Sequence, residues 1–294
     1  MKRISEEMIK DWLPKREPDA HKGDLGRVLI AAGSKGMMGA CILSCRGAFR
    51  SGSGLVAACC DPALFSDVHA GVPEATCVSR DGADPTKYDA VAIGPGLGVN
   101  RTNHEWICRI LTEYDGPVVL DADGLNCLSE YGIPSISEIS ARLILTPHAG
   151  EAAKLVNAEM AEGAPRVTPA QVSADRAFYG KFLAGKLNAV CIMKGRGSLV
   201  CCPDGSVYEN TTGNAGMATG GSGDVLTGIL VSLSGQYAAR GLSSDAAAVM
   251  AAVCGVYLHG LAGDLAAQQW GQAGIMASDL ADFGALALKH IDKK

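Results

Sequence analysis

Short apolar runs alternate with amphipathic stretches along much of this chain, and that alternation limits the folds open to it. Residues 27–33 (RVLIAAG) are continuously apolar, favour a strand and end in glycine, which is typical of a strand buried on both faces. Residues 39–52 then have the character of a helix. The same pairing predicts strands at 54–60, 88–96, 117–123, 141–148 and 188–195, and helices at 103–114 and 169–187. We therefore expect an α/β protein of three αβα layers, with a mostly parallel central sheet and helices on both faces.

The remainder of the chain has a different character. Residues 197–210 predict a hairpin that turns at Pro203, Asp204 and Gly205. Three helices are expected after it, at 224–241, 243–268 and 278–291. No linker, repeat or low-complexity tract interrupts the sequence, so we expect a single domain over residues 1–294.

The composition argues against several classes of protein. The chain has 294 residues and is 48% hydrophobic, so it can bury a sizeable core, while aromatic residues make up only 5%. Its net charge is −5 and no basic stripe occurs, which argues against nucleic acid as a partner. The charged N-terminus lacks the apolar segment of a secretory signal, and no stretch reaches the length of a membrane span without interruption by charge or glycine. We expect a cytoplasmic protein without a membrane partner.

The cysteines do not predict a disulfide framework or a metal site. There are eleven, an odd number, and several lie inside apolar runs. Cysteines placed in this way are typical of small buried hydrophobic side chains in a reducing compartment. No Cys-x-x-Cys pair occurs, so a structural zinc site is poorly supported.

A glycine-rich stretch at residues 213–230 (GNAGMATGGSGDVLTGIL) surrounds a single acid, Asp224. Glycines directly before a helix leave free N–H groups at its positive end, which predicts an anion hole for phosphate. Its expected members are Gly220, Gly221, Ser222 and Gly223. Asp224 itself could simply cap the helix. Alternatively, it accepts a proton from a hydroxyl group that attacks a phosphoryl group.

Polar or glycine-rich corners follow several of the predicted strands. Five of them read GSKGMMGA, GPGLG, DADGLN, TPHAGE and KGRGS. Because ligands of open α/β sheets bind beyond the carboxyl ends of the strands, these corners suggest one long crevice. Neither the G-x-x-x-x-G-K-[ST] phosphate loop nor a G-x-G-x-x-G loop after the first strand is present. The sequence therefore indicates phosphate chemistry outside the usual nucleotide-binding folds.

Six motifs occur in a particular order: HKGDLGRVLIAAGS, GPGLG, DADGLN, LTPHAGE, MKGRGS and NAGMATGGSGDVLTG. Together they resemble the NAD(P)H-hydrate dehydratase family, whose members belong to the ribokinase-like superfamily. The resemblance runs from about residue 21 to the last predicted helix. It implies a ribokinase-like fold and one NAD(P)H-hydrate dehydratase domain, without the epimerase domain that many bacterial relatives carry ahead of it.

The resemblance implies a metabolite-repair enzyme that consumes a nucleotide. Family members dehydrate the S form of hydrated NADH and NADPH (NADHX and NADPHX) back to the reduced cofactors. The motif around Asp224 is similar to the bacterial type, which favours ADP as co-substrate, with AMP and phosphate as products; ATP is the alternative. Mg²⁺ is the implied cofactor, held mainly by phosphates and water, so no protein ligand to a metal is expected. A homotetramer and a separate NAD(P)HX epimerase as functional partner are also implied.

The resemblance further implies roles for individual residues. Asp224 is the expected catalytic base, and it contacts the hydrated nucleotide together with Ala40, Gly98 and His148. The expected contacts of the AMP moiety are Lys194, Gly195, Arg196, Gly197, Ser198 and Gly223. Prolines that are usual in the family are replaced here by Ala149 and Ala215, which should loosen two turns without removing a reactive group.

Other interpretations of these residues and of the function stay open at this point. His148 could be a strand-end histidine bonded to the backbone, and Lys194 could be a solvated surface lysine. Asp121 and Asp123 could form turns, or one of them could join an Mg²⁺–phosphate network through water. Two functions compete with the dehydratase. One is a ribokinase-like, ATP-dependent kinase of a small alcohol of the hydroxyethylthiazole or hydroxymethylpyrimidine type, and the other is a non-catalytic nucleotide sensor on the same fold.

Overall fold

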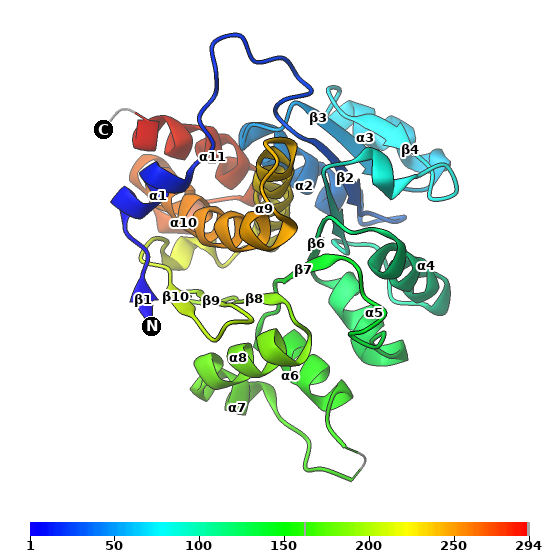
Figure 1. The fold of residues 1–294 in the computed structure, drawn as a ribbon. Coiled ribbons are helices and arrows are strands. Elements are labelled where there is room, and N and C mark those ends of the chain that lie inside the picture. The colour runs from blue at the N-terminus through cyan, green and yellow to red at the C-terminus, as the bar shows by residue number, and fades with distance from the viewer. Residues whose placement is uncertain (162, 293–294) are drawn as a thin grey trace.

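The computed structural model describes residues 1–161 and 163–292, which build one ten-stranded sheet of order β1-β10-β9-β8-β7-β6-β5-β2-β3-β4 (Figure 1). The neighbouring strands are parallel, except that β9 runs antiparallel to both β8 and β10. The expected mostly parallel sheet is therefore confirmed. The strands are β1 (Lys2–Arg3), β2 (Arg27–Ala31), β3 (Leu55–Cys59), β4 (Thr76–Val78), β5 (Ala90–Ile93), β6 (Pro117–Leu120), β7 (Arg142–Leu145), β8 (Val190–Met193), β9 (Leu199–Cys201) and β10 (Val207–Glu209).

Helices cover both faces of the sheet, as Figure 1 shows. Alternate residues of each strand point to opposite faces, so in β2 Val28 and Ile30 join one core cluster while Leu29 and Ala31 join the other. The first face carries α1 (Glu6–Trp12), α2 (Met38–Arg50), α3 (Phe65–Gly71), α9 (Ser222–Ala239), α10 (Ser244–Trp270) and α11 (Ala277–Asp292). The second carries α4 (Arg101–Glu113), α5 (Asp123–Tyr131), α6 (Ala149–Ala158), α7 (Pro169–Ala174) and α8 (Arg176–Lys186). The three-layer αβα architecture is confirmed.

The six strands predicted before residue 196 are all present, and the predicted hairpin is the β9–β10 pair, with Gly205 at a φ of 83° in its turn. The helix expected at 169–187 is instead two helices, α7 and α8. Asp175 ends the first helix, and its carboxylate accepts a hydrogen bond from the N–H of Phe178, 3.0 Å away, which starts the second. The sequence patterns did not predict α1, α3, α5, α6, β1 or β4, which are all short.

Helix α10 is long and apolar, yet most of it is buried inside the protein. Among the described residues, it is the helix that is long and apolar enough to cross a membrane, with a mean hydropathy of 1.6 in its most apolar 18-residue window. The sequence had suggested that no stretch reaches this length without interruption by charge or glycine, and Gly255, Gly260 and Gly263 do interrupt this helix. In the structure 72% of that window is buried, because α10 packs against α9 and α11. Burial of this kind is typical of a core helix.

Helices α2 and α9 approach each other closely because glycine stands at the contact. A Cβ atom on Gly228 would lie 2.0 Å from the carbonyl oxygen of Ser44, and one on Gly47 would lie 2.6 Å from that of Val225. The hydroxyl group of Ser44 also donates a hydrogen bond to the carbonyl oxygen of Asp224, 3.0 Å away. Helix α2 therefore fixes the position of the first turn of α9.

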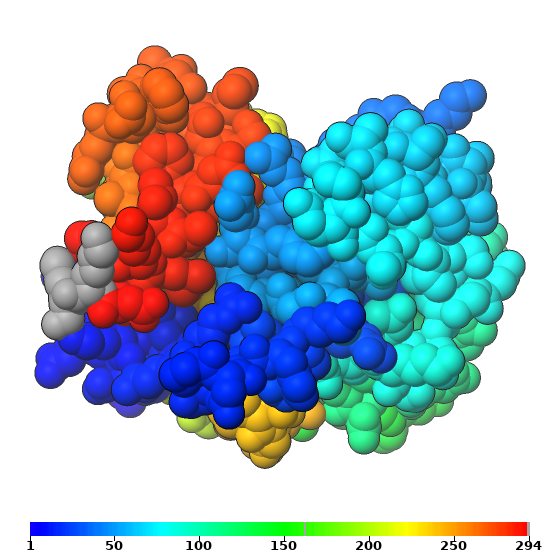
Figure 2. Space-filling model, turned by 90° about the horizontal axis from the view of Figure 1, so that it is seen from above, coloured from blue at the N-terminus to red at the C-terminus, as the bar shows by residue number. Residues whose placement is uncertain are grey.

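The N-terminal segment belongs to the core as well. Ile4 and Ile9 are 1% and 0% exposed and lie in the cluster that α10 and α11 also fill. The phenol group of Tyr237 donates a hydrogen bond to the carbonyl oxygen of Trp12, 3.0 Å away. Figure 2 shows this segment, in dark blue, lying against the C-terminal helix, in red. The fold thus includes residues that precede the motifs of the family.

Candidate active site

Side chains from the carboxyl ends of two strands meet a side chain of helix α9 in a buried network. Asp121 follows β6 and is 1% exposed. One of its carboxylate oxygens lies 2.7 Å from the Nζ atom of Lys194, which follows β8. The other oxygen accepts a hydrogen bond of 2.9 Å from the hydroxyl group of Thr227 in α9. Both oxygens of Asp121 are therefore engaged by protein donors, as burial of a charge requires.

Lys194 is an interior cation, so the interpretation as a solvated surface lysine is wrong. Its Nζ atom lies 2.7 Å from Asp121 and 3.7 Å from the carboxylate of Glu151 in α6. Burial by itself would lower the pKa of Lys194, but the charges of Asp121 and Glu151, with a smaller contribution from Asp224, raise that pKa above its ordinary value. The ammonium group is thus charged at neutral pH and is fixed in place.

Asp224 lies in the first turn of α9 but does not cap the helix. The N-cap is Gly221, which has a φ of 91° and no side chain to donate or accept a hydrogen bond. The pKa of Asp224 is raised to about 6, chiefly by burial and then by the charges of Asp121 and Asp123, while Lys194 opposes the shift. A carboxylate with this pKa is a stronger base than an ordinary aspartate and is still ionised at neutral pH.

The first residue of α9, Ser222, is held by His259 of α10. The Nε2 atom of His259 lies 3.0 Å from the carbonyl oxygen of Ser222, to which it donates a hydrogen bond, and 3.4 Å from the hydroxyl oxygen of the same residue. Burial lowers the pKa of His259 to about 4, so the ring is neutral at physiological pH. The 18-residue helix α9 therefore starts from a fixed loop whose N–H groups suit an anion.

The corner after β5 is held by two side chains that point back at Gly98. The N–H group of Gly98 donates a hydrogen bond of 2.8 Å to the carboxylate of Asp123. The buried amide group of Asn103 donates hydrogen bonds to the carbonyl oxygens of Leu97 and Gly98, at 3.0 and 2.7 Å. Ala40 lies next to this corner, since its Cβ atom is 3.1 Å from where a Cβ atom on Gly96 would be.

His148 has a structural task at the start of α6. Its Nδ1 atom accepts hydrogen bonds from the N–H groups of Gly150 and Glu151, at 3.0 and 3.3 Å. The carboxylate of Glu151 in turn accepts one of 2.8 Å from the N–H group of His148, which completes a capping box. The interpretation of His148 as a histidine bonded to the backbone is therefore confirmed for its Nδ1 atom. Its side chain is still 60% exposed, and its Nε2 atom lies 3.3 Å from the carboxylate of Glu151.

The structure brings most of the expected site residues together. A Cβ atom on Gly223 would lie 3.5 Å from both Asp121 and Lys194, so the first turn of α9 meets the corner after β8. Ser198 lies at the far end of that second corner, where its hydroxyl group donates a hydrogen bond to the carbonyl oxygen of Gly195, 3.0 Å away. No direct contact joins Ala40 or Gly98 to Asp224 among the hydrogen bonds and ion pairs of the described residues.

Sequence patterns alone did not assign several residues that build the site. Thr227 could have been found, because its position three residues after Asp224 places it on the same side of the helix. Glu151 lies inside the TPHAGE corner and at the capping-box position relative to His148. His259 and Asn103 gave no comparable signal, since their partners are distant in the sequence or depend on the loop conformation.

Comparison with known proteins decides the family. The sequence pattern described as NAD(P)H-hydrate dehydratase matches residues 28–284. The chain belongs to this family. It is 39% identical, over 97% of its length, to the bifunctional NAD(P)H-hydrate repair enzyme of Moorella thermoacetica, and it spans 53% of that protein. It is 38% identical to the ADP-dependent (S)-NAD(P)H-hydrate dehydratase of Neisseria meningitidis, over 90% of this chain and 86% of that one.

Solved structures of NAD(P)H-hydrate dehydratases and related proteins have the same fold. The ADP/ATP-dependent NAD(P)H-hydrate dehydratase of Bacillus subtilis, co-crystallised with ATP and Mg²⁺, superposes with a TM-score of 0.83 at 30% identity, over 99% of this chain and 98% of that one. A ribokinase-like superfamily protein of Enterococcus faecalis superposes with a TM-score of 0.82 at 23% identity, over 99% and 96%. The ribokinase-like fold expected from the motifs is confirmed.

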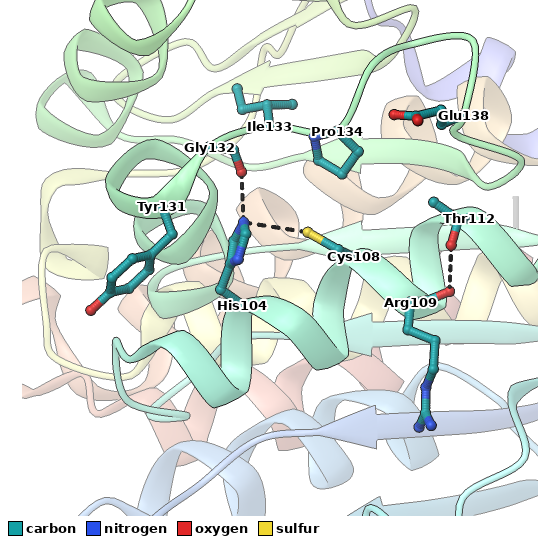
Figure 3. A pocket seen from close by; sticks show the side chains of 9 residues that line it. All are labelled: His104, Cys108, Arg109, Thr112, Tyr131, Gly132, Ile133, Pro134 and Glu138. Atoms are coloured by element: carbon teal, nitrogen blue, oxygen red, sulfur yellow. Dashed lines mark hydrogen bonds between the residues drawn. The ribbon is translucent and has the colours of Figure 1, made fainter.

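A cavity of about 610 Å³ lies apart from this candidate site, between α4 and the segment that joins α5 to β7. Figure 3 shows His104 at its wall, with the Nε2 atom 2.7 Å from the carbonyl oxygen of Gly132 and 3.3 Å from the sulfur atom of Cys108. Burial raises the pKa of Cys108, so the thiol is not activated as a nucleophile. The residues expected from the family motifs do not line this cavity.

Proposed function

We propose that this protein dehydrates the S form of hydrated NADH and NADPH to the reduced cofactors, with ADP as co-substrate and AMP and phosphate as products. The chain spans about half the length of the bifunctional relatives it matches, so the proposal concerns the reaction of the described domain. The observation that carries it is the carboxylate of Asp224, with a pKa of about 6, at the glycine-rich start of α9. The names of the relatives from Neisseria and Bacillus supply the substrate class.

The chemistry begins with Asp224 as the general base. Its carboxylate takes the proton of the C6 hydroxyl group of the hydrated ring, and that oxygen attacks the terminal phosphoryl group of ADP. The P–O bond to AMP breaks as the new P–O bond forms. Charge that develops on the moving phosphoryl group is stabilised by the N–H groups of the loop at residues 220–223 and by the ammonium group of Lys194.

Elimination completes the reaction. Phosphate is a far better leaving group than hydroxide, and the lone pair of the ring nitrogen beside C6 assists departure of the C6–O electron pair. Loss of a proton from C5 then restores the C5–C6 double bond of the dihydropyridine. The phosphoryl transfer thus drives a dehydration, which separates this function from that of a kinase with a stable phosphorylated product.

The residues of the site do not fit a directly coordinated Mg²⁺ at Asp121. Both of its carboxylate oxygens are already bonded to protein donors, and no group of three or more acidic, histidine or cysteine side chains suited to a metal occurs in the described part of the chain. We therefore propose that Mg²⁺ enters with the nucleotide, held by phosphates and water. We also propose that the protein is cytoplasmic and forms a homotetramer. A separate NAD(P)HX epimerase is its proposed functional partner.

The test is a turnover assay with NADHX, Mg²⁺ and either ADP or ATP in parallel. We expect the absorbance of NADH to recover, with one AMP formed per NADH when ADP is supplied. A stable phosphorylated alcohol formed from ATP without such recovery would favour the small-alcohol kinase. Nucleotide binding with no turnover of any of these substrates would favour the sensor.

A further inference from the structure

Arg176 is the first residue of α8 and reaches the corner at residues 194–198, which the resemblance to the family assigns to the AMP moiety of the nucleotide. Its Nη2 atom donates hydrogen bonds to the carbonyl oxygens of Arg196 and Gly197, at 2.7 and 3.2 Å. A single guanidinium group therefore fixes two successive peptide units of this corner. None of the six sequence motifs described above includes Arg176, which lies well before the corner in the sequence.

The packing between Arg176 and the corner is close on a second side. A Cβ atom on Gly195 would lie 2.8 Å from the Nη1 atom of Arg176, and Gly195 has a φ of 144°. Glycine is therefore required where the guanidinium group lies against the backbone. The Nη1 atom is buried and has no hydrogen-bond partner among the described residues.

The charge of Arg176 has no carboxylate partner. No ion pair of the described residues includes it, and the adjacent acid, Asp175, uses its carboxylate to cap α8. A cation at the N-terminus of a helix is also placed against the helix dipole. Stability of α8 alone does not account for an arginine at this position, whereas an anionic ligand at the neighbouring corner does.

We propose that Arg176 is a positioning residue of the nucleotide subsite, which holds the 194–198 corner in the conformation that receives the AMP moiety and adds positive charge behind it. This inference rests on the proposed function, because that function supplies the nucleotide. Arg176 acts through the backbone of the corner and does not touch the reacting atoms.

The experiment compares the purified full chain with Arg176→Met and Arg176→Lys, and uses Lys181→Met as a control on the same helix, where the side chain is exposed. For Arg176→Met we expect the KM for ADP to rise about tenfold, because hydrogen bonds from a charged donor are lost. The KM for NADHX and kcat should stay within about threefold of the wild-type values, because both parameters depend on parts of the site that Arg176 does not contact. Arg176→Lys should recover part of the loss by keeping the charge, and Lys181→Met should behave as the wild type.

Two results would overturn the inference: a KM for ADP within twofold of the wild-type value in Arg176→Met, or an equal loss in both KM values together with a lowered Tm. The second result would mean that Arg176 only supports the fold. Measurements on the wild-type protein distinguish an error in the inference about Arg176 from an error in the proposed function. If the wild type binds ADP and restores NADH while Arg176→Met is normal, only the inference about Arg176 is lost.

Discussion

At the scale of single residues, the proposed chemistry depends on a carboxylate that the fold makes more basic. Asp224 is partly removed from water and lies near Asp121 and Asp123, which together outweigh the opposing charge of Lys194. Asp121 thus has two effects, because it raises the pKa of Asp224 and also holds Lys194 in place. Both effects need the network around Asp121 to stay intact.

The activity should fall in acid with the ionisation of Asp224. A general base works only when deprotonated, so kcat/KM for NADHX should decline about tenfold per pH unit below about pH 6, and should be level from about pH 7 to 8. Steady-state rates between pH 5 and 8, corrected for acid decay of the substrate, measure this. Asp67→Asn, which removes an exposed carboxylate of α3, should leave the midpoint unchanged. A level profile down to pH 5 would exclude Asp224 as the base.

Asp224→Asn should separate catalysis from stability. Turnover should drop by about 10²–10⁴-fold, while ADP binding by calorimetry stays within a few-fold. The pKa of Asp224 is higher in the folded chain than in the unfolded one, so its ionised form opposes folding above about pH 6, and that opposition disappears as the pH falls toward 4. The variant should therefore have a higher Tm than the wild type at pH 8 and a similar one near pH 4. Unchanged turnover would remove Asp224 from the mechanism.

At the scale of elements, the α2–α9 contact positions the turn that carries Asp224. Gly228→Ala would bring a methyl group within 2.0 Å of the carbonyl oxygen of Ser44, so the two helices must separate. We expect a loss of about 1–3 kcal/mol in the free energy of unfolding, together with reduced kcat, because the start of α9 shifts. Urea unfolding and the turnover assay measure the two effects. Gly284→Ala in α11, with no atom within 4 Å of its Cβ, is the control and should be neutral or slightly stabilising. Equal stability of both variants would contradict the close contact.

At the scale of the whole molecule, the N-terminal segment is part of the hydrophobic core. Ile9 is 0% exposed in the cluster that α10 and α11 share, so Ile9→Ala should lower the free energy of unfolding by about 2–5 kcal/mol. Lys10→Ala, the exposed neighbour on the same helix, should change it by less than about 0.5 kcal/mol. Chemical denaturation followed by circular dichroism measures both. Similar values for the two variants would mean that the segment adds little to the fold.

The sequence by itself determined where the main strands lie along the chain, the hairpin and the glycine-rich start of α9, because these follow from local alternation, turn residues and glycine. It also supplied the motifs that identify the family. The short elements α5 and α6 escaped prediction, since a few residues after a strand contain too little periodicity to separate a helix from a corner. Helix α10 has the length and hydropathy of a membrane span although glycines interrupt it, and only the structure shows that it is mostly buried.

Only the tertiary structure decided what the site residues can do. The pKa of Asp224 depends on burial and on Asp121 and Asp123, which come from a different part of the sequence. The links from Lys194 to Asp121 and from Arg176 to the 194–198 corner likewise join segments that no local pattern connects. Local sequence specifies elements through backbone preference and periodicity, whereas electrostatic environment is set by which elements pack together. For that reason the acid could be named from its motif, but its basicity and its support could be found only in the folded chain.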